Sequence, residues 1–78
     1  MRVRLRFFAS LRERLGPGEV RTVRPGTTAG SLWDSLVRSQ PAIGAVCIRI
    51  AVNERYVDPE HELADGDEVA FLPPVAGG

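Results

Sequence analysis

The residues with the clearest chemical potential are the last two, Gly77 and Gly78, which offer a terminal carboxylate with no side chain beside it. A tip made of glycine can enter a slot too narrow for a Cβ atom. Before it stand Pro73 and Pro74, whose rings hold the backbone extended. At about 3.3 Å per residue, the segment after Pro73 would reach roughly 17 Å, enough to place the carboxylate inside a partner's active site. The sequence therefore favours a carrier over a self-contained catalyst.

A small, flexible end can also be without function, because chain termini are often disordered. The run Glu68–Leu72 favours a functional tail, since its strand-like pattern leads directly into Pro73 and would launch residues 74–78 from a sheet. The residues themselves leave both interpretations open.

Length and composition describe one folded, soluble module. The chain has 78 residues, of which 44% are hydrophobic and 26% charged. Ten arginines balance ten acidic residues, which argues against a nucleic-acid-binding surface. The basic residues cluster early in the chain and the acidic residues late, which indicates either solvated element faces or a polarised surface that steers a partner.

The sequence offers little for metal binding or catalysis. A single cysteine, Cys47, excludes an internal disulfide, and we expect it to be a small, partly buried hydrophobic residue. The only histidine, His61, lies between two glutamates without a second soft ligand at a useful spacing, so we expect a solvated loop residue and no metal site. The absence of a secretory signal or an apolar stretch approaching 18 residues predicts a cytoplasmic protein without membrane association.

Periodicity predicts an α+β fold. Alternation in the first strand places Val3, Leu5 and Phe7 on one face, and the main helix begins after the N-cap Thr28. A capping box at Ser10 predicts a short helix after the first strand, and Asp65-Gly66-Asp67 is assigned to a turn rather than to a cation site. The predicted strands cover residues 2–8, 19–24, 47–52, 56–57 and 68–72, with the main helix at 29–37.

This order of elements is that of a ubiquitin-like β-grasp: a mixed sheet of four to five strands, one main helix and a short helix after the first strand. Residues 1–73 would form the domain and residues 74–78 a flexible Gly-Gly tail. No internal repeat and no linker other than the tail is present.

Two apolar side chains, Phe8 and Leu72, fall on the face of the sheet that points away from the core. If the first and last strands are neighbours, as in a β-grasp, these residues form an apolar patch at the base of the tail. Such a patch beside a projecting tail predicts a docking surface. The alternative is that residues 9–15 fold back and cover Phe8.

The sequence carries several motifs of one known family. They are Phe7-Phe8-Ala9 with Arg12-Glu13, then Ala51-Val52-Asn53, then Asp65-Gly66-Asp67-Glu68-Val69-Ala70-Phe71, and finally Pro73-Pro74-Val75 with Gly77-Gly78. Over its whole length the chain resembles the small subunit of molybdopterin synthase, a ubiquitin-like sulfur carrier. Sulfur carriers for thiamin share the fold and the Gly-Gly end, but the Pro-Pro-Val approach and the Phe-Phe-Ala opening favour the molybdopterin branch.

The resemblance implies a reaction cycle at one atom. An ATP-dependent adenylyltransferase, an E1-like activating enzyme, would adenylate the carboxylate of Gly78. A sulfur donor would convert this glycyl adenylate into a thiocarboxylate, 1-thioglycine. Inside the synthase large subunit, the thiocarboxylate would donate sulfur to cyclic pyranopterin monophosphate, and two rounds would build the dithiolene. The chain would be a non-catalytic subunit of a heterotetramer and would bind no cofactor of its own.

The resemblance also assigns roles to residues. Gly78 would be the modified terminus, while Phe8 and Leu72 would dock on the partner. The residues that line the partner's channel would be Pro73, Pro74, Val75, Ala76 and Gly77. Leu72 stands where an aromatic residue can stand in relatives, and Ala76 where a small polar residue can stand.

Other functions would use the same features. The terminus could conjugate the chain to lysines of target proteins, as a ubiquitin-like modifier, or carry sulfur for thiamin or for tRNA thiolation. The chain itself has no lysine, so it could not form self-linked chains. A third alternative is a β-grasp interaction module with an inert tail.

Overall fold

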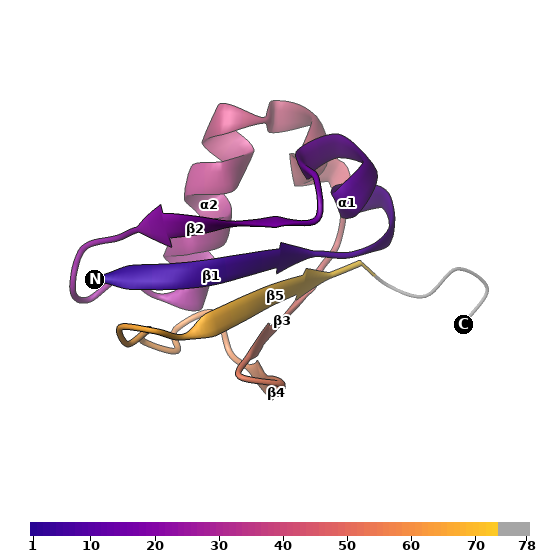
Figure 1. The fold of residues 1–78 in the computed structure, drawn as a ribbon. Helices are drawn as coiled ribbons and strands as arrows, with labels where there is room; N and C mark the ends of the chain where they lie inside the picture. Colours follow the sequence, from indigo (N-terminus) through magenta and orange to yellow (C-terminus); the bar gives the residue numbers. More distant parts are fainter. Residues whose placement is uncertain (74–78) are drawn as a thin grey trace.

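The computed structural model describes residues 1–73, which form a five-stranded sheet with helices on one face (Figure 1). The elements are β1 (Arg2–Phe7), α1 (Ala9–Leu15), β2 (Gly18–Thr22), α2 (Ala29–Ser39), η1 (Pro41–Ala45), β3 (Arg49–Val52), β4 (Arg55–Val57) and β5 (Glu68–Leu72). The strand order is β2-β1-β5-β3-β4, and the predicted α+β β-grasp is confirmed. The predicted tail, residues 74–78, lies outside the described residues.

The first and last strands are neighbours in the middle of the sheet. β1 pairs with β5 in parallel, with Phe7 opposite Phe71. The other pairings, β1 with β2, β5 with β3 and β3 with β4, are antiparallel. Parallel neighbours need a long crossover connection, and here that connection contains α2. The parallel pairing places the residue that follows β1 beside the end of β5.

The core lies between α2 and the inner face of the sheet, by which we mean the face turned toward α2. Val3, Leu5 and Phe7 alternate along β1, and each is at most 2% exposed. The ring of Phe71 stacks on Phe7 with centroids 5.9 Å apart and meets Trp33 of α2 at 5.3 Å. Such aromatic pairs contribute about 0.5–1.5 kcal/mol beyond burial. The inward face predicted for the first strand is confirmed.

The helix α2 begins at the predicted N-cap, Thr28. Its Oγ1 accepts a hydrogen bond from the amide of Ser31 at 3.1 Å, and Oγ of Ser31 accepts one from the amide of Thr28 at 2.9 Å. This capping box contributes about 1 kcal/mol. The first turn is closely packed, because a Cβ atom on Gly30 would lie 2.8 Å from Cβ of Pro59. No helix within residues 1–73 is long and apolar enough to cross a membrane.

The short helix α1 does not start at the capping box predicted for Ser10. It begins at Ala9, and its N-cap is Phe8, which makes no side-chain hydrogen bond. Ala9 has a left-handed backbone, φ 52°, so the chain turns sharply directly after β1. The amide of Leu11 then donates to the carbonyl oxygen of Phe8 at 3.1 Å. The prediction was wrong because the turn at Ala9 starts the helix before the hydroxyl of Ser10 can cap it.

Three strands are shorter than predicted, and one helical turn was not predicted. β1 ends at Phe7, one residue before the predicted end. β2 ends at Thr22, two residues before the predicted end, although Val23 still exchanges two backbone hydrogen bonds with Met1. β3 begins at Arg49, two residues after the predicted start, opposite the last residue of β5. The 3₁₀ helix η1 follows α2 and buries Ile43 in the core. Strand length is therefore set by the partner strand, which a pattern in one segment does not contain.

Hydrogen bonds of Asn53 and Asp67 tie the β3–β4 turn to the start of β5. The carboxylate of Asp67 accepts bonds from Nδ2 of Asn53 at 2.9 Å and from the amide of Ala64 at 2.8 Å. Oδ1 of Asn53 accepts a bond from the amide of Glu68 at 3.0 Å. These bonds hold the predicted turn before β5, and so they help to set where Leu72 leaves the sheet.

This arrangement makes the substitution Asp67→Ala a test of the turn. We expect the free energy of unfolding to fall by about 1–2 kcal/mol, because two donors lose their acceptor. Urea denaturation followed by circular dichroism measures the change. Asp58→Ala is the matched control, since Asp58 is exposed and its side chain makes no hydrogen bond within residues 1–73. Equal stability of the two variants would contradict this role for Asp67.

Candidate functional site

The predicted apolar patch lies where β1 and β5 end. Phe8 follows β1 with an extended backbone, φ −126° and ψ 156°, so the alternation of the strand continues through it. Because Phe7 lies opposite Phe71, the register continues to Phe8 beside Leu72. Both side chains therefore belong to the outer face, the face of the sheet opposite to α2. The structure brings together the two residues that the sequence assigned to docking.

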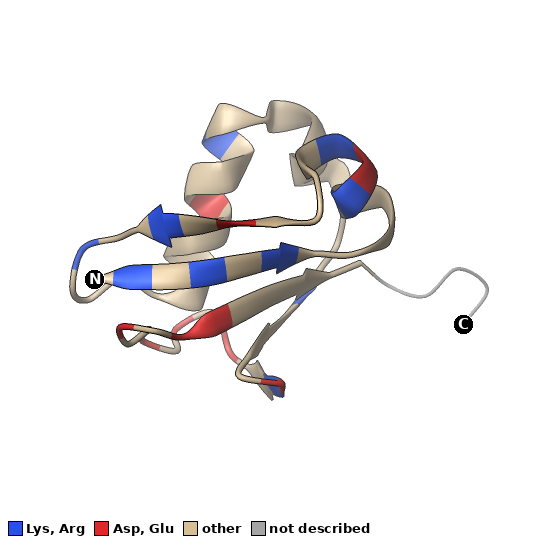
Figure 2. Ribbon diagram, viewed as in Figure 1, with Lys and Arg blue, Asp and Glu red and all other residues tan. Residues whose placement is uncertain are grey.

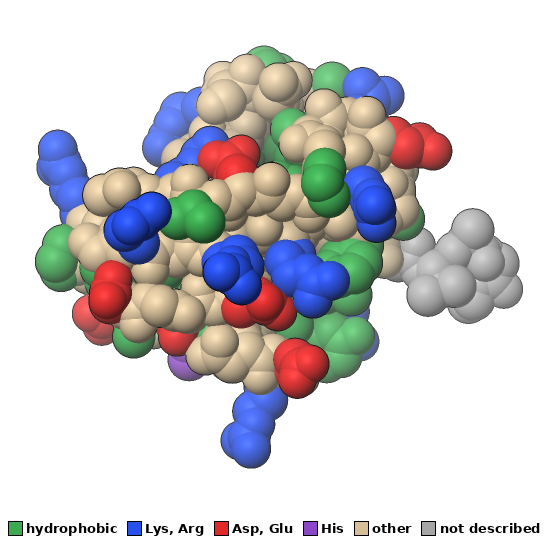
Figure 3. Space-filling view, in the orientation of Figure 1, with side chains coloured by type: hydrophobic (Ala, Val, Ile, Leu, Met, Phe, Trp, Pro, Cys, Tyr) green, Lys and Arg blue, Asp and Glu red, His purple; other side chains and the backbone are tan. Residues whose placement is uncertain are grey.

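Phe8 and Leu72 are both half-buried and stand outside the core. Neither belongs to the buried core cluster or to the partly buried residues that pack against it. The helix α1 instead sends Leu11 into the core, where it is 0% exposed. Residues 9–15 therefore do not bury Phe8 completely, and part of its side chain stays accessible. Figure 3 shows hydrophobic side chains gathered on this face near the ends of β1 and β5.

An arginine covers part of the apolar patch. The guanidinium carbon of Arg6 lies 5.2 Å from the centroid of the Phe8 ring, and Nη1 of Arg6 is 3.5 Å from Oε1 of Glu68. A cation over an exposed aromatic ring gains about 0.5–1 kcal/mol. A partner that contacts Phe8 must therefore also contact or displace Arg6.

The outer face carries a second aromatic residue that the sequence analysis did not single out. Tyr56 of β4 lies opposite Ala51, and its side chain is 61% exposed. The guanidinium of Arg49 stacks over its ring at 4.2 Å, and Arg49 itself lies opposite Leu72. Arg49 alternates with the buried Ile50 along β3. This alternation is the signal in the sequence that places the side chain of Arg49 on the outer face.

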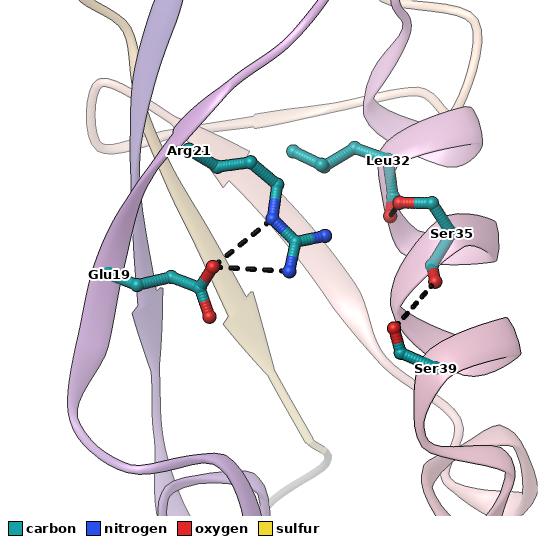
Figure 4. Close-up of polar contacts among 5 residues, drawn as sticks. All are labelled: Glu19, Arg21, Leu32, Ser35 and Ser39. Carbon is teal, nitrogen blue, oxygen red and sulfur yellow. Dashed lines mark hydrogen bonds and ion pairs between the residues drawn. The ribbon is translucent and has the colours of Figure 1, made fainter.

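On the face of the sheet turned toward α2, the edge strand β2 carries polar side chains (Figure 4). The register with β1 directs Glu19 and Arg21 to the helix side, where Nη2 of Arg21 is 3.1 Å from Oε2 of Glu19. In Figure 4 this ion pair points toward Ser35 and Ser39 of α2. The two side chains pair with each other, so charged groups occupy this part of the surface between β2 and α2.

The remaining candidate groups line a hollow at the other edge of the sheet. His61 is exposed, as predicted, but Cys47 is also exposed, so its predicted partial burial is wrong. Cys47 precedes the start of β3 and therefore lies in a loop rather than against the core. Both residues line an open hollow of about 1040 Å³ together with Trp33 and Tyr56. Within residues 1–73, no group of three His, Cys, Asp or Glu residues could hold a metal ion.

The other predicted site residues belong to the end of the chain. Pro73 is half-buried and follows β5 directly. The residues Pro74, Val75, Ala76, Gly77 and Gly78 lie outside the described residues, and their predicted roles stay predictions. The described part of the candidate site is therefore a surface of apolar and arginine side chains around the end of β5.

Known proteins resemble this chain in sequence and in structure. The sequence matches the ThiS family over residues 5–78. The molybdopterin synthase sulfur carrier subunit of Mycobacterium tuberculosis is 39% identical over 82 residues, an alignment that covers 100% of this chain and 99% of that protein. The small archaeal modifier protein 1 of Haloferax volcanii superposes with a TM-score of 0.84 at 29% identity, with both chains covered completely.

A solved complex adds a relative in contact with another protein. In the structure of subunits 1 and 2 of the molybdopterin-converting factor from Helicobacter pylori, the matching chain has a TM-score of 0.71 and 27% identity, with both chains covered completely. The sequence relative exceeds 30% identity over the full length, and the family match includes the last residue. The chain therefore belongs to the ThiS family of ubiquitin-like sulfur carriers, together with the sulfur carrier subunits of molybdopterin synthase.

Proposed function

We propose that this chain is the sulfur carrier subunit of a molybdopterin synthase and that its reactive group is the carboxylate of Gly78. The observation that carries the proposal is the position of the apolar patch. Phe8 and Leu72 lie where β5 ends, directly before the residues that lead to Gly77-Gly78. A partner that receives this end of the chain therefore meets the patch at the entrance.

The proposed chemistry begins with activation, because a carboxylate is a poor electrophile. An ATP-dependent adenylyltransferase transfers AMP to the carboxylate of Gly78 and releases pyrophosphate. A donor that supplies sulfur at the oxidation level of sulfide then displaces AMP from the glycyl adenylate. The product is 1-thioglycine, a thiocarboxylate at the end of the chain.

The thiocarboxylate then acts as the sulfur nucleophile inside the large subunit. Its sulfur displaces an oxygen substituent of cyclic pyranopterin monophosphate and forms a thioester that joins Gly78 to the pterin. Water then hydrolyses this thioester, which leaves the sulfur on the pterin and regenerates the carboxylate of Gly78 for another round. The dithiolene of molybdopterin contains two sulfur atoms, so each product needs two charged carriers. Substrate binding and proton transfer belong to the large subunit in this proposal, and the carrier supplies position and sulfur.

The large subunit is the partner that the comparisons support. The Helicobacter pylori structure is, by its title, a complex of subunits 1 and 2 of the molybdopterin-converting factor. We propose the same pairing for this chain, in a heterotetramer of two carriers and two large subunits. The reducing environment in which a free thiocarboxylate persists agrees with the cytoplasmic location expected from the sequence.

A second function is favoured by one comparison. The Haloferax volcanii relative is named a modifier protein, and it superposes over the whole chain. A modifier would use the same glycyl adenylate but would form an amide with lysines of target proteins. A ladder of covalent adducts on immunoblots of cell extracts would favour this function over the carrier.

Changing the length of the tail tests the proposed role of Gly78. Deleting Gly78, or adding one alanine after it, moves the carboxylate by about 3.3 Å along an extended chain. We expect sulfur transfer in the reconstituted synthase to fall by at least about 100-fold, because misplacement of a reacting group by even 1 Å has a large effect. The circular dichroism spectrum and the unfolding midpoint serve as controls for the fold. Retained activity in either variant would contradict the proposal.

Substitution of Phe8 tests the apolar patch. We expect Phe8→Arg to weaken binding to the large subunit by about 2 kcal/mol or more, roughly a 30-fold increase in Kd, as for other aromatic anchors. Its unfolding midpoint should stay nearly unchanged, because Phe8 lies outside the core cluster. Ala42→Arg is the matched control, since it adds the same side chain at an exposed position of η1. A large loss of stability in Phe8→Arg would show instead that Phe8 supports the fold.

A further inference from the structure

A row of arginines runs along the outer face and ends at the apolar patch. Arg2, Arg4 and Arg6 alternate along β1, so their side chains share the face that carries Phe8. All three are exposed. Successive members of this arginine row are about 6.6 Å apart along the strand, which places Arg2 roughly 20 Å from Phe8. Figure 2 marks basic residues at intervals along β1, and Figure 3 shows basic side chains across the middle of this face.

Two carboxylates, those of Glu68 and Asp65, balance the arginine row only in part. Glu68 pairs with Arg6 at 3.5 Å and also lies opposite Arg4 in the sheet. Oδ1 of Asp65 accepts a hydrogen bond from the backbone amide of Arg2 at 2.7 Å, which places a second carboxylate at the far end of the row. Within residues 1–73, the side chains of Arg2 and Arg4 form no ion pair. The row therefore has an excess of positive charge on a chain whose net charge is zero.

The neighbouring strand, β2, places no charged residue opposite the arginine row. On β2, the residues opposite the row are Thr22, Val20 and Gly18, none of which is charged. A shallow hollow of about 470 Å³ lies between β1 and β2 and is lined by Arg4, Arg6 and Val20, among others. A side chain of a partner can therefore reach the guanidinium groups without moving the backbone.

A partner that covers the apolar patch must also cover part of the row. The guanidinium of Arg6 lies over the ring of Phe8. A standard interface buries about 800 Å² on each partner, against a total accessible surface of 5157 Å² for this chain. Two half-buried side chains, Phe8 and Leu72, cannot supply such an area by themselves. The footprint has to extend along the outer face, and the row adjoins the patch.

Covering an arginine without an opposite charge is unfavourable, because the charge loses its hydration and gains no partner. Opposite charges on the partner remove this penalty and also increase the rate of association. We propose that the arginine row is the electrostatic half of the docking face and that it meets carboxylates on the partner protein that receives the tail. This inference rests on the proposed function, in which that partner is the synthase large subunit.

An acidic protein fits the surface better than a nucleic acid does. The row ends in apolar side chains, Phe8 and Leu72, and Val20 beside it is 52% exposed. Nucleic-acid sites usually combine a strong positive net charge with many phosphate contacts, whereas this chain is neutral. Mixed apolar and charged surfaces are typical of protein interfaces.

Charge reversal in the row tests the inference. The full-length chain and its Arg4→Glu variant are compared for association with the large subunit of molybdopterin synthase from the same organism, by stopped-flow kinetics between 0.05 and 0.3 M NaCl. We expect Arg4→Glu to lower the association rate constant at low salt by about 10-fold or more and to flatten its salt dependence. Arg4→Gln should show an intermediate loss. Arg38→Glu is the matched control, because it makes the same charge change at an exposed position of α2. It should alter the rate less than about 2-fold.

Each outcome decides a separate point. If the wild-type chain binds and Arg4→Glu behaves like Arg38→Glu, the role of the row is overturned while the proposed function stands. If the wild-type chain does not bind the large subunit, both proposals fail. Binding of a 20-base-pair RNA duplex at 0.15 M salt, lost in Arg4→Glu, would overturn the acidic-protein partner in favour of nucleic acid. An unfolding midpoint shared by all variants confirms that these effects concern binding.

Discussion

The parallel pairing of β1 with β5 is the constraint on which the other features of this structure depend. It joins strands from opposite ends of the sequence, and the crossover between them carries α2 onto the inner face. The stacked rings of Phe7 and Phe71, 5.9 Å apart, hold the two strands together from the core side. On the other side, the same register sets Phe8 beside Leu72. The register between β1 and β5 therefore sets both which side chains form the core and which form the apolar patch. A slip of one residue in this register would move the side chains of the shifted strand to the opposite face of the sheet.

The two faces of the sheet differ in composition, and in our proposal the inner face provides stability while the outer face recognises the partner. Inward side chains of the central strands are apolar and buried, and outward side chains combine arginines with a few apolar residues. The bonds between Asn53 and Asp67 anchor the start of β5, and the apolar patch marks its end. β5 is paired with β1 on one side and with β3 on the other, so the proposed reactive terminus would start from a defined position. Preorganisation of this kind lowers the cost of placing the reacting group in a partner's site.

Much of this arrangement could be predicted from local patterns in the sequence, and each wrong prediction has a physical cause. Alternation in β1 identified both the core face and Phe8, and Thr28 marked the start of α2, because these signals are local. The strand ends were misplaced because they depend on the length of the partner strand. Cys47 was predicted to lie at the start of β3 and to be partly buried. β3 begins only at Arg49, so Cys47 lies in the loop before it and is exposed. The stacking of Arg49 on Tyr56 also depends on pairing between strands, so no pattern within one strand contains it. The roles of residues 74–78 still rest on the sequence and the family.

The measurement that tests the account most directly is the intact mass of the chain after incubation with the adenylyltransferase, ATP and a sulfur donor. We expect a gain equal to the replacement of one oxygen by sulfur, and no gain in a chain that lacks Gly78. An unchanged mass, in a mixture that converts another carrier to its thiocarboxylate, would contradict the central claim that this terminus carries sulfur.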